Sequence, residues 1–213
     1  MKTFKTLLAG AGLLLLCACS GTAQQAAQTA EQTDQNAVVD AILARRSIRK
    51  YTDQPVEREK LDILAQCAIN APSGMNQQPW QVRVVDSKEY IDGITELYKA
   101  QADPRFTSDP DFKNMFRNAP AVIFIASPKD GRGVFDCGLL AENIMVAAVS
   151  LDLGTVCLGG PIHFMKESAD ARPYVDRLNL PDDYELLYAI GIGYPDEAPD
   201  AKPRDAEKWQ YVD

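Results

Sequence analysis

The longest apolar stretch after the first 36 residues constrains the fold of this chain most. Residues 133–153 read as one helix that is apolar almost all round and leaves no face for solvent. Such a helix has to be covered on every side, by a sheet and neighbouring helices or by another chain. The stretch therefore predicts a layered body. It also carries more apolar surface than one chain of this length would cover, which predicts an obligate dimer.

Helical and strand patterns alternate along residues 37–213, a length that suits one domain. Pro72-Ser73-Gly74 breaks a helix, and Ser87 is placed to cap the next one. Few strands among many helices predict an α+β sandwich. The expected helices cover 38–46, 55–70, 87–102, 133–153 and 165–178, and the expected strands cover 81–85, 121–126, 155–158 and 185–192.

The N-terminal segment predicts targeting rather than folding. Two lysines precede an apolar run over residues 7–18, which is too short to span a bilayer. Leu16-Cys17-Ala18-Cys19 resembles a bacterial lipobox, with Cys19 as the lipidated first residue of the mature protein. An ordinary cleaved signal peptide with incidental cysteines is the alternative. We expect a signal peptide over 1–18 and a flexible tether over 19–36. Lipid anchoring would then hold the protein in the bacterial cell envelope, on the periplasmic face.

The charge balance and the cysteines argue against several classes of function. The chain has 22 basic and 30 acidic residues, which argues against nucleic acid or an anionic membrane surface as a partner. Beyond Cys19, an odd number of cysteines without close pairs predicts no disulfide framework and no zinc site. We expect Cys67, Cys137 and Cys157 to be small buried apolar side chains. With one histidine, His163, the sequence predicts neither a metal site nor a triad hydrolase.

Two clusters of basic and amide side chains carry the strongest functional signal. Arg45-Arg46-Ser47-Ile48-Arg49 offers planar guanidinium groups and a hydroxyl, which suit the oxygens of a phosphate. Asn76-Gln77-Gln78-Pro79-Trp80 offers amides that both donate and accept, as the edge of a pyrimidine-like ring requires. Together the clusters predict a flavin. Read alone, the arginines would be a helix end whose cations complement the dipole.

These clusters and three further motifs resemble the FMN-dependent nitroreductase family. The further motifs are Leu158-Gly159-Gly160, Gly191-Ile192-Gly193-Tyr194-Pro195 and Lys202-Pro203-Arg204. The resemblance covers residues 37–213. It implies a nitroreductase-like three-layer sandwich with a central, mostly antiparallel sheet. It also implies an intertwined homodimer with two FMN sites at the interface.

The resemblance further implies which residues hold the cofactor. Arg49 is expected to lie near N1 and the C2 carbonyl of the ring, where reduction places negative charge. The backbone N–H groups around Gly159-Gly160 are expected to approach N5 of the ring. The 72–78 stretch is expected from the partner subunit. Phosphate contacts are expected from Arg45, Ser47, Lys202 and Arg204. The whole expected FMN-binding set is Arg45, Arg46, Ser47, Arg49, Pro72, Ser73, Gly74, Asn76, Gln78, Leu158, Gly159, Gly160, Lys202 and Arg204.

The expected function is FMN-dependent reduction of nitroaromatic, quinone or similar electron-poor acceptors by a ping-pong mechanism. NAD(P)H is the donor that the resemblance implies, and an envelope electron donor is the alternative. No side chain need act as a catalytic group, because the flavin supplies the chemistry. Phe106, Phe112 and Phe116 would shape the substrate pocket, with ordinary packing as the alternative. A substrate dehydrogenase and a non-catalytic, lipid-tethered flavin-binding redox partner remain the competing functions.

Overall fold

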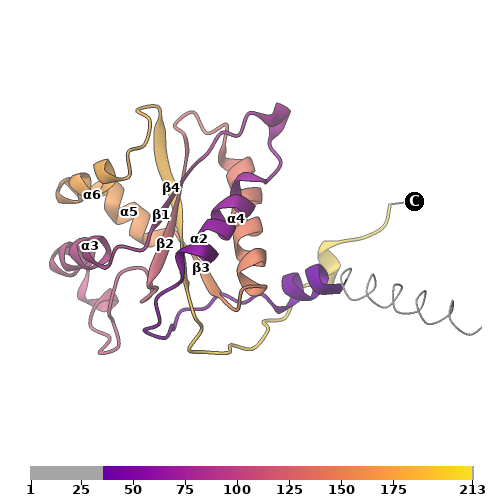
Figure 1. Ribbon diagram of the computed structural model, residues 1–213, viewed down its shortest axis with the longest axis horizontal. Coiled ribbons are helices and arrows are strands. Elements are labelled where there is room, and N and C mark those ends of the chain that lie inside the picture. The colour runs from indigo at the N-terminus through magenta and orange to yellow at the C-terminus, as the bar shows by residue number, and fades with distance from the viewer. Residues whose placement is uncertain (1–35, 213) are drawn as a thin grey trace, which may run out of the picture. The chain divides into compact units, whose positions relative to one another are not determined.

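A computed structural model describes residues 36–212, which are built on a four-stranded antiparallel sheet (Figure 1). The sheet has the order β1-β2-β4-β3, and each neighbouring pair of strands is antiparallel. Strand β2 is buried at every position but its last, because it lies in the middle of the sheet with both faces covered. The strands are β1 (Gln81–Val85), β2 (Ala121–Pro128), β3 (Gly154–Leu158) and β4 (Tyr184–Gly193).

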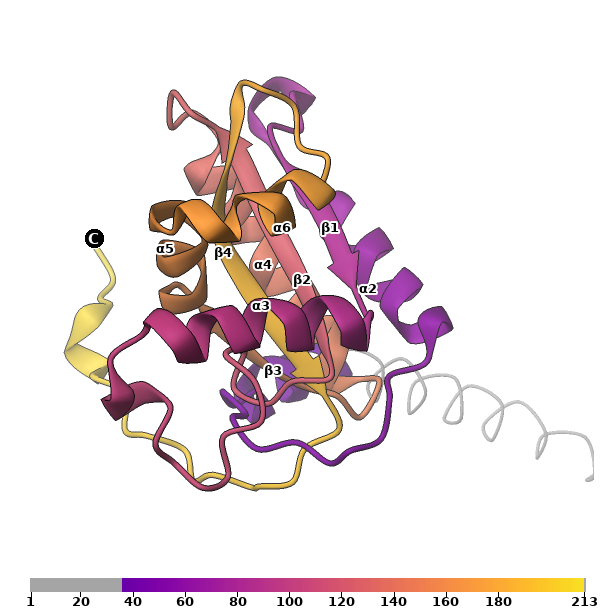
Figure 2. The ribbon, with the colours of Figure 1, turned by 90° about the vertical axis from the view of Figure 1, so that its left-hand side faces the viewer.

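Helices cover both faces of the sheet, as Figures 1 and 2 show. Helices α2 (Arg58–Ile69) and α4 (Val134–Val149) lie on one face, and α3 (Lys88–Gln101), α5 (Gly160–Glu167) and α6 (Arg172–Arg177) on the other. Alternate residues of β2 enter the two cores: Ile123 packs on the α2–α4 side and Phe124 on the α3–α5 side. The predicted α+β three-layer sandwich with a mostly antiparallel sheet is confirmed.

Local signals explain where most helices begin and end. The side chain of Ser87 accepts a hydrogen bond from the N–H of Tyr90, so α3 begins at Lys88 as the sequence predicts. Helix α2 begins three residues after Pro55, with Glu57 as its N-cap residue. Helix α4 ends at Val149 rather than at 153, because the chain turns through Asp152, whose φ is 60°.

The helix predicted over 165–178 is wrong. The structure has α5 from Gly160 to Glu167, an extended Ser168, a short 3-10 turn and then α6 from Arg172 to Arg177. Each α-helix of this pair has a proline in its first turn, where a missing N–H costs nothing. The two prolines therefore mark two helix starts.

Helix α4 has one packed side and one open side in the single chain. Cys137, Leu140 and Ile144 are fully buried against α2 and the sheet, and burial raises the pKa of the Cys137 thiol to about 11. On the open side, Phe135 is 76% exposed and Val134 48%. An unpaired apolar side of this kind is the surface that the predicted dimer would cover, and the dimer stays a prediction.

The remaining expectations about the chain ends and cysteines have mixed outcomes. Residues 36–44 are helical, while the signal peptide, Cys19 and nearly all of the tether lie outside the described residues. Within residues 36–212, no helix is long and apolar enough to cross a membrane, and no cluster of metal-ligating side chains occurs. The described cysteines are free, but Cys157 is exposed, because it lies on the outer strand β3, where the sheet ends. The expected burial of Cys157 is therefore wrong.

Candidate functional site

The basic segment (residues 45–49) is held against the outer strand β3. Ser47 forms a parallel bridge with Thr155, and the N–H of Ile48 donates to the Thr155 carbonyl at 2.9 Å. The hydroxyl of Tyr51 donates to the Ile48 carbonyl at 2.6 Å, and burial raises the pKa of Tyr51. Ile48 is buried and Arg49 exposed, so the segment anchors itself through one side chain and presents the next one to solvent.

The adjacent arginines have different roles. Arg46 donates from Nη1 to the carbonyls of Leu43 at 2.7 Å and Arg45 at 2.8 Å, so it satisfies a helix end, as the alternative interpretation predicted. Among the described residues, the Arg45 side chain makes one long contact of 3.7 Å, to Glu142, and Arg49 donates to the Ser47 carbonyl at 3.1 Å. A guanidinium has five N–H donors, so Arg45 and Arg49 keep donors for an anion.

Strand β3 ends at a turn with open backbone. Leu158 is buried, whereas Gly159 and Gly160 are exposed. A Cβ atom built on either glycine would meet nothing within 4 Å. A flat molecule could therefore lie directly on this backbone, close to the first N–H groups of α5. Along β3, Leu158 follows Thr155 by about 10 Å, so the basic segment and the open turn are neighbours on one edge of the sheet.

The amide cluster lies in a tight turn with an unusual backbone conformation, the amide turn (residues 73–78). Met75, Asn76 and Gln78 all have positive φ, at 51°, 56° and 49°. The turn is locked because the Ser73 Oγ accepts from the Gln78 N–H at 2.9 Å, and Gln78 Nε2 donates to Asn76 Oδ1 at 3.2 Å. Non-glycine residues rarely adopt this conformation, and clusters of such residues occur mainly at functional sites. The turn exposes Met75 to 89%.

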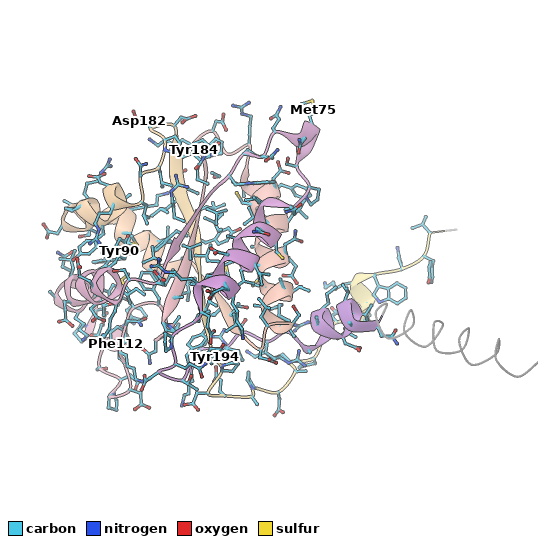
Figure 3. All side chains as sticks on the ribbon, viewed as in Figure 1. Met75, Tyr90, Phe112, Asp182, Tyr184 and Tyr194 are labelled. Atoms are coloured by element: carbon cyan, nitrogen blue, oxygen red, sulfur yellow. The ribbon has the colours of Figure 1, made fainter. Side chains whose placement is uncertain are left out.

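A single chain does not bring the two clusters together. Gln81, which follows the amide turn, pairs with Ala126 at one end of β2. Thr155, which holds Ser47, pairs with Ile192, and Ile192 pairs with Ala121 at the other end of β2. The separation along the strand is about 17 Å, and the clusters also lie at opposite edges of the sheet. Figure 3 shows Met75 at the top of the molecule and Tyr194, beside the basic segment, near the bottom.

The remaining expected site residues fall into two groups. Lys202 and Arg204 are exposed, and neither forms an ion pair within residues 36–212. Phe106 is 59% exposed, and Phe112 stacks on Tyr98 with ring centroids 6.4 Å apart. The expectation that Phe116 shapes the substrate pocket is wrong, because Phe116 is fully buried, packs edge-on against Phe124 and belongs to the core.

Sequence reasoning missed Glu197. Its carboxylate accepts hydrogen bonds from the N–H groups of Arg49 and Lys50, inside the basic segment. The contact joins positions 148 residues apart, so no local pattern announces it. A cavity of about 520 Å³ lies between Glu197, Arg45 and the start of β3.

Comparison with known proteins decides the family. A sequence profile described as "Nitroreductase family" matches residues 42–194. This chain belongs to the nitroreductase family. An NADPH-flavin oxidoreductase of Vibrio harveyi is 30% identical over 185 residues, which cover 79% of this chain and 70% of that protein. An NAD(P)H-dependent FMN reductase of Bacillus subtilis is 29% identical over 189 residues, with the same coverage of 79% and 70%.

Solved structures of nitroreductases have the same fold. A nitroreductase with bound FMN from Desulfitobacterium hafniense superposes with a TM-score of 0.74 at 27% identity, over 83% of this chain and 98% of that one. An FMN-dependent nitroreductase from Clostridium difficile gives a TM-score of 0.67 at 26% identity, over 84% and 100% of the two chains.

The residues of this nitroreductase fit such a cofactor. Guanidinium groups with spare donors suit the phosphate, exposed amides suit the polar edge of the ring, and the open backbone at Gly159 and Gly160 suits its flat face.

Proposed function

We propose that this chain is an FMN-dependent NAD(P)H oxidoreductase that reduces nitroaromatics, quinones or similar electron-poor acceptors. The carrying observation is the edge of β3, where the basic segment at Ser47 adjoins the open turn at Gly159 and Gly160. That edge offers a phosphate end and a ring end about 10 Å apart, a separation that a mononucleotide bridges.

The side chains divide the work of binding. Arg45 and Ser47 neutralise and orient the phosphate, with Lys202 and Arg204 supplied by the C-terminal segment. Arg49 faces the pyrimidine side of the ring, where its fixed positive charge favours the reduced state. Bound FMN supplies a ring that accepts and returns hydride equivalents, and the kinetics are therefore ping-pong. The protein contributes position, field and exclusion of water.

The site is completed across a homodimer. The amide turn lies at the far end of the sheet from the phosphate residues of its own chain, so Asn76 and Gln78 reach the ring from the second copy. The exposed apolar side of α4, with Phe135 at 76% exposure, supplies surface for this association.

The N-terminal sequence supports a location in the bacterial cell envelope as part of this proposal. Lipidation of Cys19 would tether the domain to a membrane through the stretch that follows this cysteine. NAD(P)H is a metabolite of the cytosol, so an envelope donor such as a membrane quinol is the second candidate for reducing the enzyme.

The test is the anaerobic visible spectrum of the full-length chain, extracted from membranes with detergent. We expect a flavin spectrum that NADPH or NADH bleaches and a nitroaromatic or a quinone restores. A flavin that only a quinol bleaches would favour the envelope donor. A colourless protein that FMN cannot reconstitute would contradict the proposed function, and a chain found only in the soluble fraction would contradict the anchor.

A further inference from the structure

Glu197 occupies an unexpected place for a carboxylate. Its Oε1 accepts hydrogen bonds from the backbone N–H of Arg49 and, at 3.2 Å, from that of Lys50. Glu197 is half-buried and forms no ion pair in the described part of the chain. Its carboxylate therefore interacts with two successive backbone N–H donors, in the stretch that also carries Arg45 and Ser47.

Glu197 closes a junction between two distant stretches of sequence. The N–H of Thr52 donates to the Tyr194 carbonyl at 3.0 Å, and the N–H of Asp196 donates to the Lys50 carbonyl at 2.9 Å. Tyr51 and Pro195 form an antiparallel bridge. This ladder ends at Asp196, and Glu197 extends it by one further step through its side chain. The stretch that continues from Glu197 carries Lys202 and Arg204.

The charges around this junction would otherwise compete. Arg45 lines the same cavity as Glu197, and the carboxylate contacts the backbone of the two cationic residues Arg49 and Lys50 without forming an ion pair with either side chain in the described part of the chain. On the other side, Lys113 pairs with Asp53 at 2.5 Å, and the hydrogen bond and charge of Asp53 and, to a smaller extent, the charge of Asp196 raise the pKa of Lys113. A carboxylate bound to backbone N–H groups leaves the guanidinium groups free for an external anion, while its negative charge lowers the field that they produce.

We propose that Glu197 is a positioning residue for the cofactor, which joins the two stretches that carry the phosphate-binding cations and moderates the charge of Arg49. The inference rests on the proposed function and deepens it. Two consequences can be separated, because the hydrogen bonds need an acceptor and the moderation of charge needs a negative charge.

The test compares Glu197→Ala with Glu197→Gln in the full-length chain. Glutamine keeps a carbonyl acceptor for both N–H groups but has no charge. We expect Glu197→Ala to weaken FMN binding about tenfold or more, and Glu197→Gln to change it less than about threefold. We expect the midpoint potential of bound FMN to become more positive in Glu197→Gln, because the field of Arg49 is then less compensated. Fluorescence titration and redox titration measure the two effects.

Asp200→Asn is the matched control, since Asp200 lies exposed on the same stretch and forms no hydrogen bond or ion pair within the described residues. It should leave both quantities unchanged. Unaltered FMN affinity in Glu197→Ala, or an unaltered potential in Glu197→Gln, would overturn the inference. If Glu197→Ala fails to fold, the potential of Glu197→Gln decides. Failure of the wild-type chain to bind FMN would instead overturn the proposed function.

Discussion

Arg45 and Arg46 adjoin in sequence, yet the structure gives them different tasks. Arg46 donates to two backbone carbonyls at a helix end, whereas the Arg45 side chain, which is 23% exposed, has a single 3.7 Å contact, to Glu142, within residues 36–212. An arginine that is already engaged by the backbone has fewer donors for a ligand. At the scale of single residues, phosphate binding should therefore depend on Arg45 and Arg204 much more than on Arg46.

Replacing Arg45 or Arg204 by alanine should weaken FMN binding, by about tenfold to a hundredfold each, because a charge-assisted hydrogen bond to phosphate is lost. Arg132→Ala is the control, since Arg132 is 75% exposed and engaged by Asp130 at 2.6 Å. Fluorescence titration of FMN measures all three. Unchanged affinity in the Arg45→Ala, Arg204→Ala double variant would show that the phosphate lies elsewhere.

The sequence predicts part of the site at this scale and misses another part for a physical reason. Arginine, serine and amide clusters announce themselves because a phosphate and a polar ring need those groups. Glu197 does not, because its role depends on a backbone hydrogen bond across 148 residues. Phe116 misleads, because an aromatic side chain in an irregular stretch suits a pocket or a core equally well.

At the scale of elements, β3 links the fold to the site through the glycines at its two ends. A Cβ on Gly154 would lie 2.7 Å from the Cγ1 atom of Ile48, which is buried beside Ser47. Gly154→Ala should therefore destabilise the fold by about 1–3 kcal/mol, as overpacking does. Gly159 has helical φ and ψ and open space around it, so Gly159→Ala should leave stability within about 1 kcal/mol. FMN binding should nevertheless weaken, because the new methyl stands where the ring approaches.

Urea unfolding of the apoprotein and FMN titration separate the two variants. The expected pattern is a lower unfolding midpoint for Gly154→Ala alone. Equal midpoints for both variants would mean that Ile48 moves aside freely, and unaltered FMN binding in Gly159→Ala would mean that the ring does not lie on this turn.

The elements that the sequence predicts well are those with their own end signals. Ser87 fixes the start of α3, and the predicted strand over 81–85 agrees with β1. The stretch 165–178 fails because its apolar period continues across Ser168, while the backbone there is extended. The prolines in the first turns of α5 and α6 indicate two separate helix starts, which the apolar period alone does not show.

At the scale of the whole molecule, the sheet holds the two halves of the site apart. The amide turn precedes Gln81, opposite Ala126, whereas Ser47 docks near the other end of β2, about 17 Å away along the strand. In the proposed symmetric dimer, every site would therefore take its cations from one chain and its amides from the other. This arrangement makes each site sensitive to substitutions in both chains.

Mixed dimers test that arrangement. One chain carries Arg45→Ala with Arg204→Ala, and the other carries Asn76→Ala with Gln78→Ala. Each variant homodimer should have two impaired sites, but the mixed dimer should have one intact site and one doubly impaired site. We expect it to bind about half as much FMN as the wild-type dimer, as measured by the flavin absorbance of dimers isolated through two different affinity tags. If each site belonged to one chain, the mixed dimer would bind none tightly.

The reciprocal mixture gives the opposite result and excludes a trivial rescue. A wild-type chain paired with a chain that carries all four substitutions has the same number of altered residues per dimer. In the shared arrangement, the wild-type arginines face altered amides and the wild-type amides face altered arginines, so neither site is intact. A site built within one chain would leave the wild-type half at full affinity. A site shared between chains therefore predicts half of the FMN binding in the first mixture and none in the second, and a site within one chain predicts the reverse. A change in protein stability cannot produce this reversal, because both mixtures should have the same stability.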